Sequence, residues 1–89
     1  MNKPLVSVIM PVYNGEKYIK QAVDSVYEQG VSLELLVIDD GSTDRTKEVL
    51  SAYEGREDFQ YIKNKQNMGA AGSRNRGVKL AKGDYIAFL

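Results

Sequence analysis

The sequence of 89 residues contains no cysteine and no histidine. Disulfides, zinc sites built on thiolate or imidazole, and Ser-His or Cys-His catalysis are therefore excluded within this chain. Any metal bound here would need oxygen ligands. Twelve basic and twelve acidic residues cancel, so no basic excess indicates a nucleic acid partner and no acidic tail indicates a charge-driven one.

Long hydrophobic runs are also missing. No apolar stretch approaches the roughly 20 residues that a membrane-spanning helix requires, and no signal peptide is visible at the start of the chain. We therefore expect a cytoplasmic protein, with peripheral attachment to the inner face of the cell membrane as a further expectation for the full-length protein. The length suits one small domain, residues 1–89, with a modest core.

Short apolar, β-branched runs alternate with segments of helical spacing, which is typical of an α/β fold. The patterns predict strands over residues 5–10, 35–38, 59–64 and 85–89, and helices over residues 16–29, 44–53 and 70–81. We expect Pro11 to end the first strand and Asn14 to cap the first helix. The third strand alternates apolar and polar residues, so it should be a half-exposed edge, whereas the fourth should be buried.

Strand, helix and strand in this order predict right-handed crossovers between parallel strands. The expected architecture is a Rossmann-like, three-layer α/β/α arrangement with a mainly parallel sheet of order 3-2-1-4. In the third helix, Gly72 and Gly77 each cost about 1 kcal/mol relative to alanine. Something, either another element or a ligand, should therefore pack close to its backbone, and the pattern predicts one face of the helix made of Ala71, Arg74, Val78 and Ala81.

The second strand ends in two carboxylates, Asp39 and Asp40, followed by Gly41. Ligands of open α/β sheets bind beyond the carboxyl ends of the strands, so these carboxylates stand where a ligand would be recognised. The alternative is that they only terminate a strand and help to cap the helix that follows. Spacing alone leaves both interpretations open.

Three loops, residues 11–14, 39–44 and 64–69, should face one crevice in this topology. Tyr13 could stack on a planar base, or pack half-buried against the following helix. Asp40 could accept a hydrogen bond from a ring N–H, which uracil has and cytosine lacks. Residues 68–70 could offer free backbone N–H groups to an anion, and Arg74 or Arg76 could bind a diphosphate or be simply solvated.

Four blocks of the sequence resemble successive motifs of the family 2 glycosyltransferases with the GT-A fold. They are residues 6–14, residues 37–44, residues 67–69 with 73–77, and residues 82–89. Each block is short, but the four occur in the right order and spacing over nearly the whole chain. The resemblance implies the N-terminal half of an inverting enzyme that moves a sugar from a nucleoside diphosphate sugar, most often a UDP-sugar, to an acceptor hydroxyl.

The resemblance also implies roles for individual residues. Pro11 and Tyr13 would border the uridine, Asp40 would pair with the uracil edge, and Asp39 would support the nucleoside pocket. The stretch from Gly69 to Arg74 would close over the base and the ribose or phosphates. No catalytic residue and no metal ligand is assigned within this chain.

By the same resemblance, a carboxylate motif that binds Mn²⁺ or Mg²⁺ should follow Leu89, together with the acceptor site and the catalytic base. We therefore expect a truncated enzyme that transfers no sugar on its own and binds no divalent cation tightly. Its partners would be a nucleotide-sugar donor and a saccharide or lipid-linked acceptor. An uncovered sheet would favour self-association.

Two alternatives belong to other functional classes. The acidic pair Asp39-Asp40 also looks like the start of a phosphoacceptor receiver domain, but the third strand ends in Lys63-Asn64, with no aspartate near it. A stand-alone module that holds a nucleotide without chemistry is the second alternative. Nothing in the residues separates that module from a truncated enzyme, except that the last strand ends abruptly.

Overall fold

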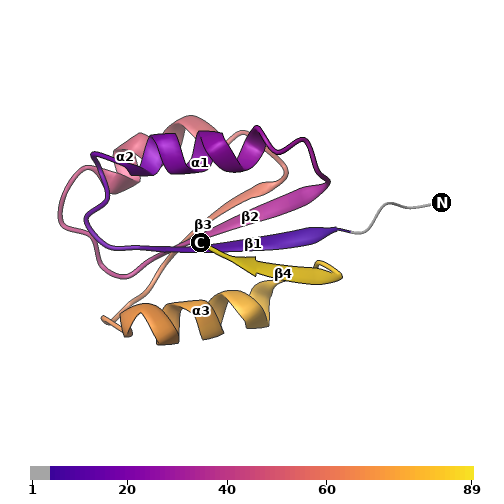
Figure 1. Cartoon of the computed structure of the whole chain (residues 1–89). Helices are drawn as coiled ribbons and strands as arrows, with labels where there is room; N and C mark the ends of the chain where they lie inside the picture. Colours follow the sequence, from indigo (N-terminus) through magenta and orange to yellow (C-terminus); the bar gives the residue numbers. More distant parts are fainter. Residues whose placement is uncertain (1–4) are drawn as a thin grey trace.

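A four-stranded sheet lies between two helical layers in the computed structural model, which describes residues 5–89 (Figure 1). Residues 1–4, which the predicted domain includes, lie outside the described residues. The elements are β1 (Val6–Val12), α1 (Ile19–Tyr27), β2 (Leu33–Asp39), α2 (Thr46–Leu50), the short 3₁₀ helix η1 (Ser51–Tyr53), β3 (Phe59–Lys63), α3 (Gly69–Leu80) and β4 (Tyr85–Phe88). All neighbouring strands are parallel and their order is β3-β2-β1-β4. The predicted fold class and strand order are confirmed.

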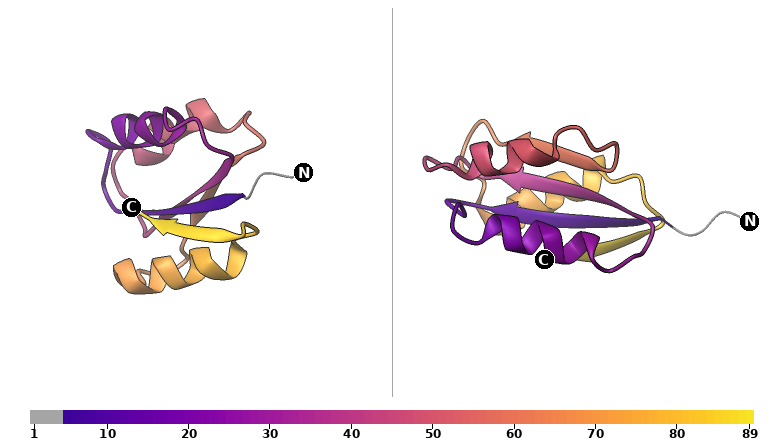
Figure 2. Two further views of the ribbon diagram at one scale, coloured as in Figure 1. Left: turned by 45° about the vertical axis from the view of Figure 1, so that its right-hand side comes forward. Right: turned by 90° about the horizontal axis from the view of Figure 1, so that it is seen from above.

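The chain changes direction across the sheet at β1. It first runs outward from β1 through β2 to β3, and then returns past β1 to place β4 on the other side. Because parallel crossovers are right-handed, this reversal puts α1 and α2 on one face and α3 on the other, as Figures 1 and 2 show. A crevice therefore opens at the carboxyl end of β1, between the two sets of crossovers.

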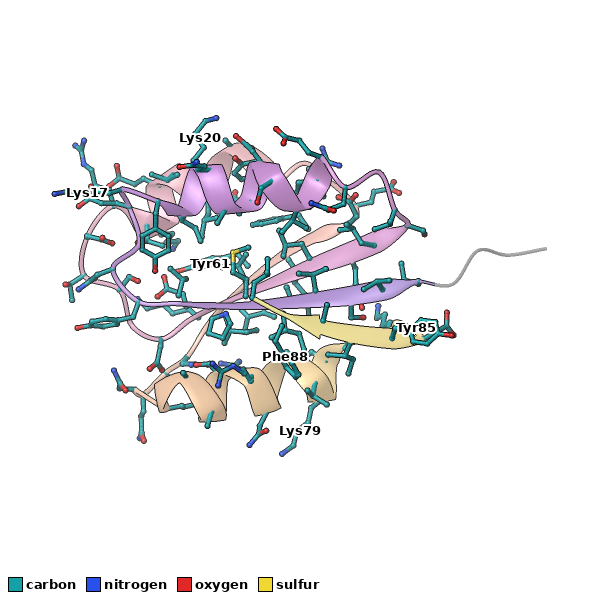
Figure 3. All side chains as sticks on the ribbon, in the orientation of Figure 1. Lys17, Lys20, Tyr61, Lys79, Tyr85 and Phe88 are labelled. Atoms are coloured by element: carbon teal, nitrogen blue, oxygen red, sulfur yellow. The ribbon has the colours of Figure 1, made fainter. Side chains whose placement is uncertain are left out.

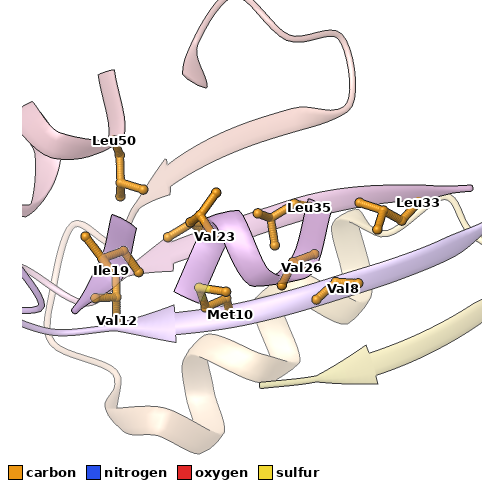
Figure 4. Close-up of a cluster of buried hydrophobic side chains, with 10 residues drawn as sticks. Val8, Met10, Val12, Ile19, Val23, Val26, Leu33, Leu35 and Leu50 are labelled. Atoms are coloured by element: carbon orange, nitrogen blue, oxygen red, sulfur yellow. The ribbon is translucent and has the colours of Figure 1, made fainter. Parts of the chain in front are cut away.

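The larger core lies between the sheet and α1. Alternate residues of β1 and β2 face this layer and meet an apolar stripe on α1 with a period of about 3.6 residues. The buried side chains of this cluster are Val8, Met10, Val12, Ile19, Val23, Val26, Leu33, Leu35, Val37 and Leu50 (Figure 4). Full burial of each large aliphatic side chain contributes roughly 1.5–3 kcal/mol, so this layer anchors the sheet.

The opposite face is covered by α3 through its smallest side chains. Ser73 and Gly77 are the buried positions of this helix, and a Cβ placed on Gly77 would lie 2.6 Å from Ile9 Cγ2. The expectation that something packs against the glycine-rich backbone is correct. The predicted face is wrong, because Val78 and Arg74 are exposed. Apolar spacing misled the prediction here, since α3 packs by close backbone approach rather than by large apolar residues.

Two expected boundaries differ in the structure. The strand β1 continues through Pro11 to Val12, because the missing N–H of Pro11 faces the side of β4, and β4 reaches only as far as Ile9. The helix α1 begins at Ile19, and Asn14 does not cap it. Asn14 instead has a φ of 50°, in the left-handed region, and joins a loop described below.

The strand β4 was expected to be buried but lies at an edge of the sheet with all four residues exposed, among them Tyr85 and Phe88 (Figure 3). An apolar groove of about 280 Å³ runs beside it, lined mainly by Val6, Val8, Val26, Val31, Leu33, Ala87 and Leu89. Self-association through this surface stays a prediction. Over residues 5–89, no helix has the length and apolar character needed to cross a membrane.

Candidate functional site

A pocket of about 140 Å³ opens at the carboxyl edge of the sheet. It is lined by Pro11, Val12, Tyr13, Asp40, Ala70 and Ser73. These residues come from the end of β1, the end of β2 and the first turns of α3, so the loops after β1 and β2 meet α3 as predicted. The Tyr13 side chain is 53% exposed rather than packed against α1, which leaves its ring available to a ligand.

Asp40 is buried and its carboxylate caps the N-terminus of α3. Oδ1 accepts hydrogen bonds from Met68 N–H at 2.7 Å and from the Asn64 amide at 2.9 Å, and Oδ2 accepts one from Gly69 N–H at 2.9 Å. These bonds, that from Met68 above all, hold the pKa of the Asp40 carboxyl below its ordinary value of 3.8 despite burial. Asp40 is therefore ionised at neutral pH.

The free N–H groups expected over residues 68–70 are not free at Met68 and Gly69. Both N–H groups donate to Asp40, so the chain's own carboxylate fills the anion site at the start of α3. A carboxylate offers about four acceptor positions, and only three are used here. Oδ2 therefore keeps one acceptor position, and Asp40 is one of the residues that line the pocket.

Asp39 lies behind the pocket and organises the loop that follows β2. Its Oδ1 accepts a hydrogen bond from Ser42 N–H at 2.8 Å, and its Oδ2 accepts one from the Tyr61 hydroxyl at 2.6 Å. Burial and the neighbouring Asp39 carboxylate raise the pKa of Tyr61, so the phenol remains a donor at neutral pH. Asp39 therefore supports the pocket without lining it.

The loops after β1 and β2 are joined by a polar network that sequence analysis did not foresee. Asn14 Oδ1 accepts hydrogen bonds from the N–H groups of Thr43 and Asp44, at 2.7 and 3.3 Å. Thr46 Oγ1 accepts one from Gly15 N–H at 2.8 Å and donates to Asp44 Oδ1. The Asn14-Gly15 dipeptide was the available signal, because Asn tolerates the left-handed backbone that this loop requires.

Asn64 and Arg76 complete the wall behind Asp40. Asn64 is buried, and its amide donates to Asp40 Oδ1 and to Ser73 Oγ, both at 2.9 Å. Arg76 donates to Asn64 Oδ1 at 2.8 Å and to Lys63 O at 3.0 Å. Arg74, which the resemblance placed in the stretch that closes over the nucleotide, is exposed on α3 and is not part of the pocket lining.

The described residues do not fit a divalent metal. Within residues 5–89 no three acidic side chains gather in a way that could hold an ion. The two carboxylates at the edge of the sheet already accept internal hydrogen bonds from Ser42, Tyr61, Asn64, Met68 and Gly69. That metal ligands lie elsewhere in a longer protein stays a prediction.

The chain is similar to known proteins over nearly its whole length. The family model described as glycosyl transferase family 2 matches residues 7–89. A putative teichuronic acid biosynthesis glycosyltransferase, TuaG of Bacillus subtilis, is 43% identical over 98% of this chain and 35% of its own length. The chain spans about a third or less of the curated relatives that it matches.

Two solved structures superpose closely on the described fold. The crystal structure of S. aureus TarS in complex with UDP-GlcNAc has a TM-score of 0.86 and 33% identity, and the match covers 94% of this chain and 25% of that one. The mannosyltransferase PcManGT from Pyrobaculum calidifontis, in complex with GDP-Man and Mn²⁺, has a TM-score of 0.85 and 30% identity, over 96% of this chain and 26% of that one. The chain therefore belongs to glycosyltransferase family 2 and has the GT-A type of fold, as the four sequence blocks, the strand order and these matches together show.

Proposed function

We propose that this chain binds the nucleotide of a UDP-sugar, as the N-terminal part of a longer inverting glycosyltransferase. The observation that carries the proposal is a pocket lined by both Tyr13, whose ring is exposed, and Asp40, whose carboxylate has one acceptor position left. A planar base can stack on the ring while its edge donates a hydrogen bond to the carboxylate. The complex of TarS with UDP-GlcNAc supports uracil as that base.

The other residues of the site contribute shape and charge in this proposal. Pro11 forms a rigid wall near the end of β1. Gly69, with a φ of 74°, is not part of the pocket lining but begins α3 directly before Ala70, which is. Asp39 holds the loop that presents Asp40. Arg74 is exposed on α3, one residue after Ser73, and in this proposal its guanidinium pairs with the diphosphate.

The transfer itself needs groups that the described residues do not supply. In an inverting displacement a base removes the proton of the acceptor hydroxyl, the oxygen bonds to the anomeric carbon, and the bond from that carbon to the diphosphate breaks. A divalent cation, Mn²⁺ or Mg²⁺, would neutralise the departing diphosphate. We propose that the base, the metal ligands and the acceptor site for a saccharide or lipid-linked substrate belong to the rest of the protein, and that this chain alone transfers no sugar.

Calorimetric titration of the chain tests the binding proposal. We expect UDP to bind, CDP and ADP to bind at least about tenfold more weakly because they lack a ring N–H at the matching edge, and Mn²⁺ to change little. GDP shares such an N–H, so it separates recognition of that group from recognition of the pyrimidine ring. Tyr13→Ala should weaken UDP binding by about 1–3 kcal/mol, the value of one base stacked on an aromatic ring.

The matched control is Tyr85→Ala. Tyr85 is also an exposed tyrosine, but it is the first residue of β4 and lies beside Val6, at the amino ends of the strands, opposite the pocket. UDP affinity should be unchanged in this variant. The proposal is wrong if the unaltered chain and the longer protein both fail to bind UDP, or if the two tyrosine variants lose the same affinity.

A further inference from the structure

Asn64 lies behind the pocket and connects two residues of its lining. The side chain is only 2% exposed, directly after β3, and it does not line the pocket. One N–H of its amide donates a hydrogen bond to Asp40 Oδ1 and the other N–H donates one to Ser73 Oγ, each at 2.9 Å. The positions of these two side chains in the pocket wall are therefore set by one buried amide.

The orientation of that amide is fixed by Arg76. Both donors of the Asn64 NH₂ group are used, while its Oδ1 accepts a hydrogen bond from Arg76 at 2.8 Å. A flipped amide would turn its oxygen toward the Asp40 carboxylate and its NH₂ toward a guanidinium, which offers only donors. Arg76 is itself held by the carbonyl of Lys63 at 3.0 Å, so the end of β3 determines the whole chain of contacts.

The consequence appears at the Asp40 carboxylate. Asn64 and Met68 together occupy Oδ1, and Gly69 occupies one position of Oδ2, so a single acceptor position remains. Without the Asn64 amide, Oδ1 would regain an open position and the carboxylate would lose one of its three fixed contacts. It could then rotate and accept hydrogen bonds from other directions, including exocyclic amino groups.

We propose that Asn64 and Arg76 are positioning residues for nucleobase specificity. They hold the carboxylate of Asp40 in one orientation, in which a single acceptor position remains for a base. The inference rests on the proposed nucleotide function and goes beyond it, since neither side chain touches the base. A ring N–H can then donate a hydrogen bond to the carboxylate without any rearrangement of the site. A base with an unprotonated ring nitrogen at that position would instead place its lone pair against a fixed negative charge.

The test compares UDP and CDP affinities of the full-length protein by calorimetry. Arg76→Met removes the guanidinium and leaves Asn64 free to turn. We expect UDP affinity to fall by about tenfold and CDP affinity to change by less than about twofold, so that the ratio between them falls by at least about fivefold. Arg76→Lys keeps a cationic donor near Asn64 Oδ1. Its ratio of UDP affinity to CDP affinity should lie between those of Arg76→Met and the unaltered protein.

Lys79→Met is the matched control, because Lys79 is an exposed cation of the same helix that points away from the sheet (Figure 3). Its affinity ratio should equal that of the unaltered protein. Asn64→Asp is the second variant: it keeps the shape but sets a carboxylate against Asp40, and it should reduce UDP affinity more than Arg76→Met does.

The outcomes separate the two proposals. If the unaltered protein binds UDP and the Arg76 variants lose UDP and CDP affinity in equal proportion, or lose neither, then the positioning role is wrong and the nucleotide function stands. If the unaltered protein does not bind UDP, both proposals are wrong. A lower ratio of UDP affinity to CDP affinity in Arg76→Met, with partial recovery of that ratio in Arg76→Lys, supports the inference.

Discussion

Asp40→Asn should lower the free energy of unfolding by about 2–4 kcal/mol, because a hydrogen bond to a buried charged group is worth about 1.5–3 kcal/mol. The amide can replace only one of the two carboxylate oxygens. Its NH₂ group would face N–H donors at Gly69 or at Met68 and Asn64, and the favourable charge at the start of α3 would be lost. Urea denaturation measures the difference, with Glu57→Gln as the exposed control that should leave stability unchanged.

Asp40→Asn should also make the stability of the fold less dependent on pH in the acid range. The pKa of Asp40 is lowered on folding, so its ionised form stabilises the native state above the ordinary pKa of 3.8. That stabilisation is lost as the pH falls through the lowered native value. The stability difference between the unaltered chain and Asp40→Asn should be constant from neutral pH to about pH 5 and shrink below about pH 4. A difference that stays constant down to about pH 2 would contradict the assignment of Asp40 as the ionised cap.

Gly83→Ala should destabilise the fold by about 3 kcal/mol, at the upper end of what an added methyl group costs in a packed site. A Cβ on Gly83 would lie 2.5 Å from Ser7 Oγ and 2.8 Å from both Leu5 O and Ser7 N. Two of these atoms belong to the backbone around the start of β1, which is held between β2 and β4 and cannot move aside. The hydrogen bond from Gly83 N–H to Ser7 Oγ would also be strained.

Gly55→Ala is the control for that substitution. Nothing lies within 4 Å of a Cβ on Gly55, so alanine should leave stability unchanged or raise it slightly. Thermal unfolding of the two variants makes the comparison. Equal midpoints for Gly83→Ala and the unaltered chain would show that the contact between the turn before β4 and the start of β1 is looser than described.

The sheet and its order were predictable because their signals are local. Four apolar runs separated by helical patterns define parallel strands, and the handedness of crossovers restricts the order. The two carboxylates after the apolar run of β2 also predicted a site at the carboxyl ends of the strands, where the structure has a pocket lined by Asp40; that a ligand binds there stays a prediction. The membership of the chain in glycosyltransferase family 2 removes the receiver-domain alternative.

The polar interior of the site was not predictable by the same means. Asn64 and Arg76 act through contacts between β3, β2 and α3, and such contacts leave no periodic pattern in the sequence. The start of α3 was predicted to offer N–H groups to a ligand. In the structure two of these N–H groups, of Met68 and Gly69, donate to Asp40, which lies 28 and 29 residues before them in the chain. The role of Asp40 in base recognition stays a prediction, and its role in holding the start of α3 was not predicted.

The central claim is that a nucleotide binds at the carboxyl edge of the sheet, between Tyr13, Asp40 and the start of α3. The most direct test is the map of backbone amide chemical shifts of the ¹⁵N-labelled protein as UDP is added. We expect the largest changes at residues 12–14, 40–42 and 68–73, and none at residues 82–85 on the opposite edge. Shifts concentrated instead in the apolar groove beside β4, or no shifts at saturating UDP, would contradict the account.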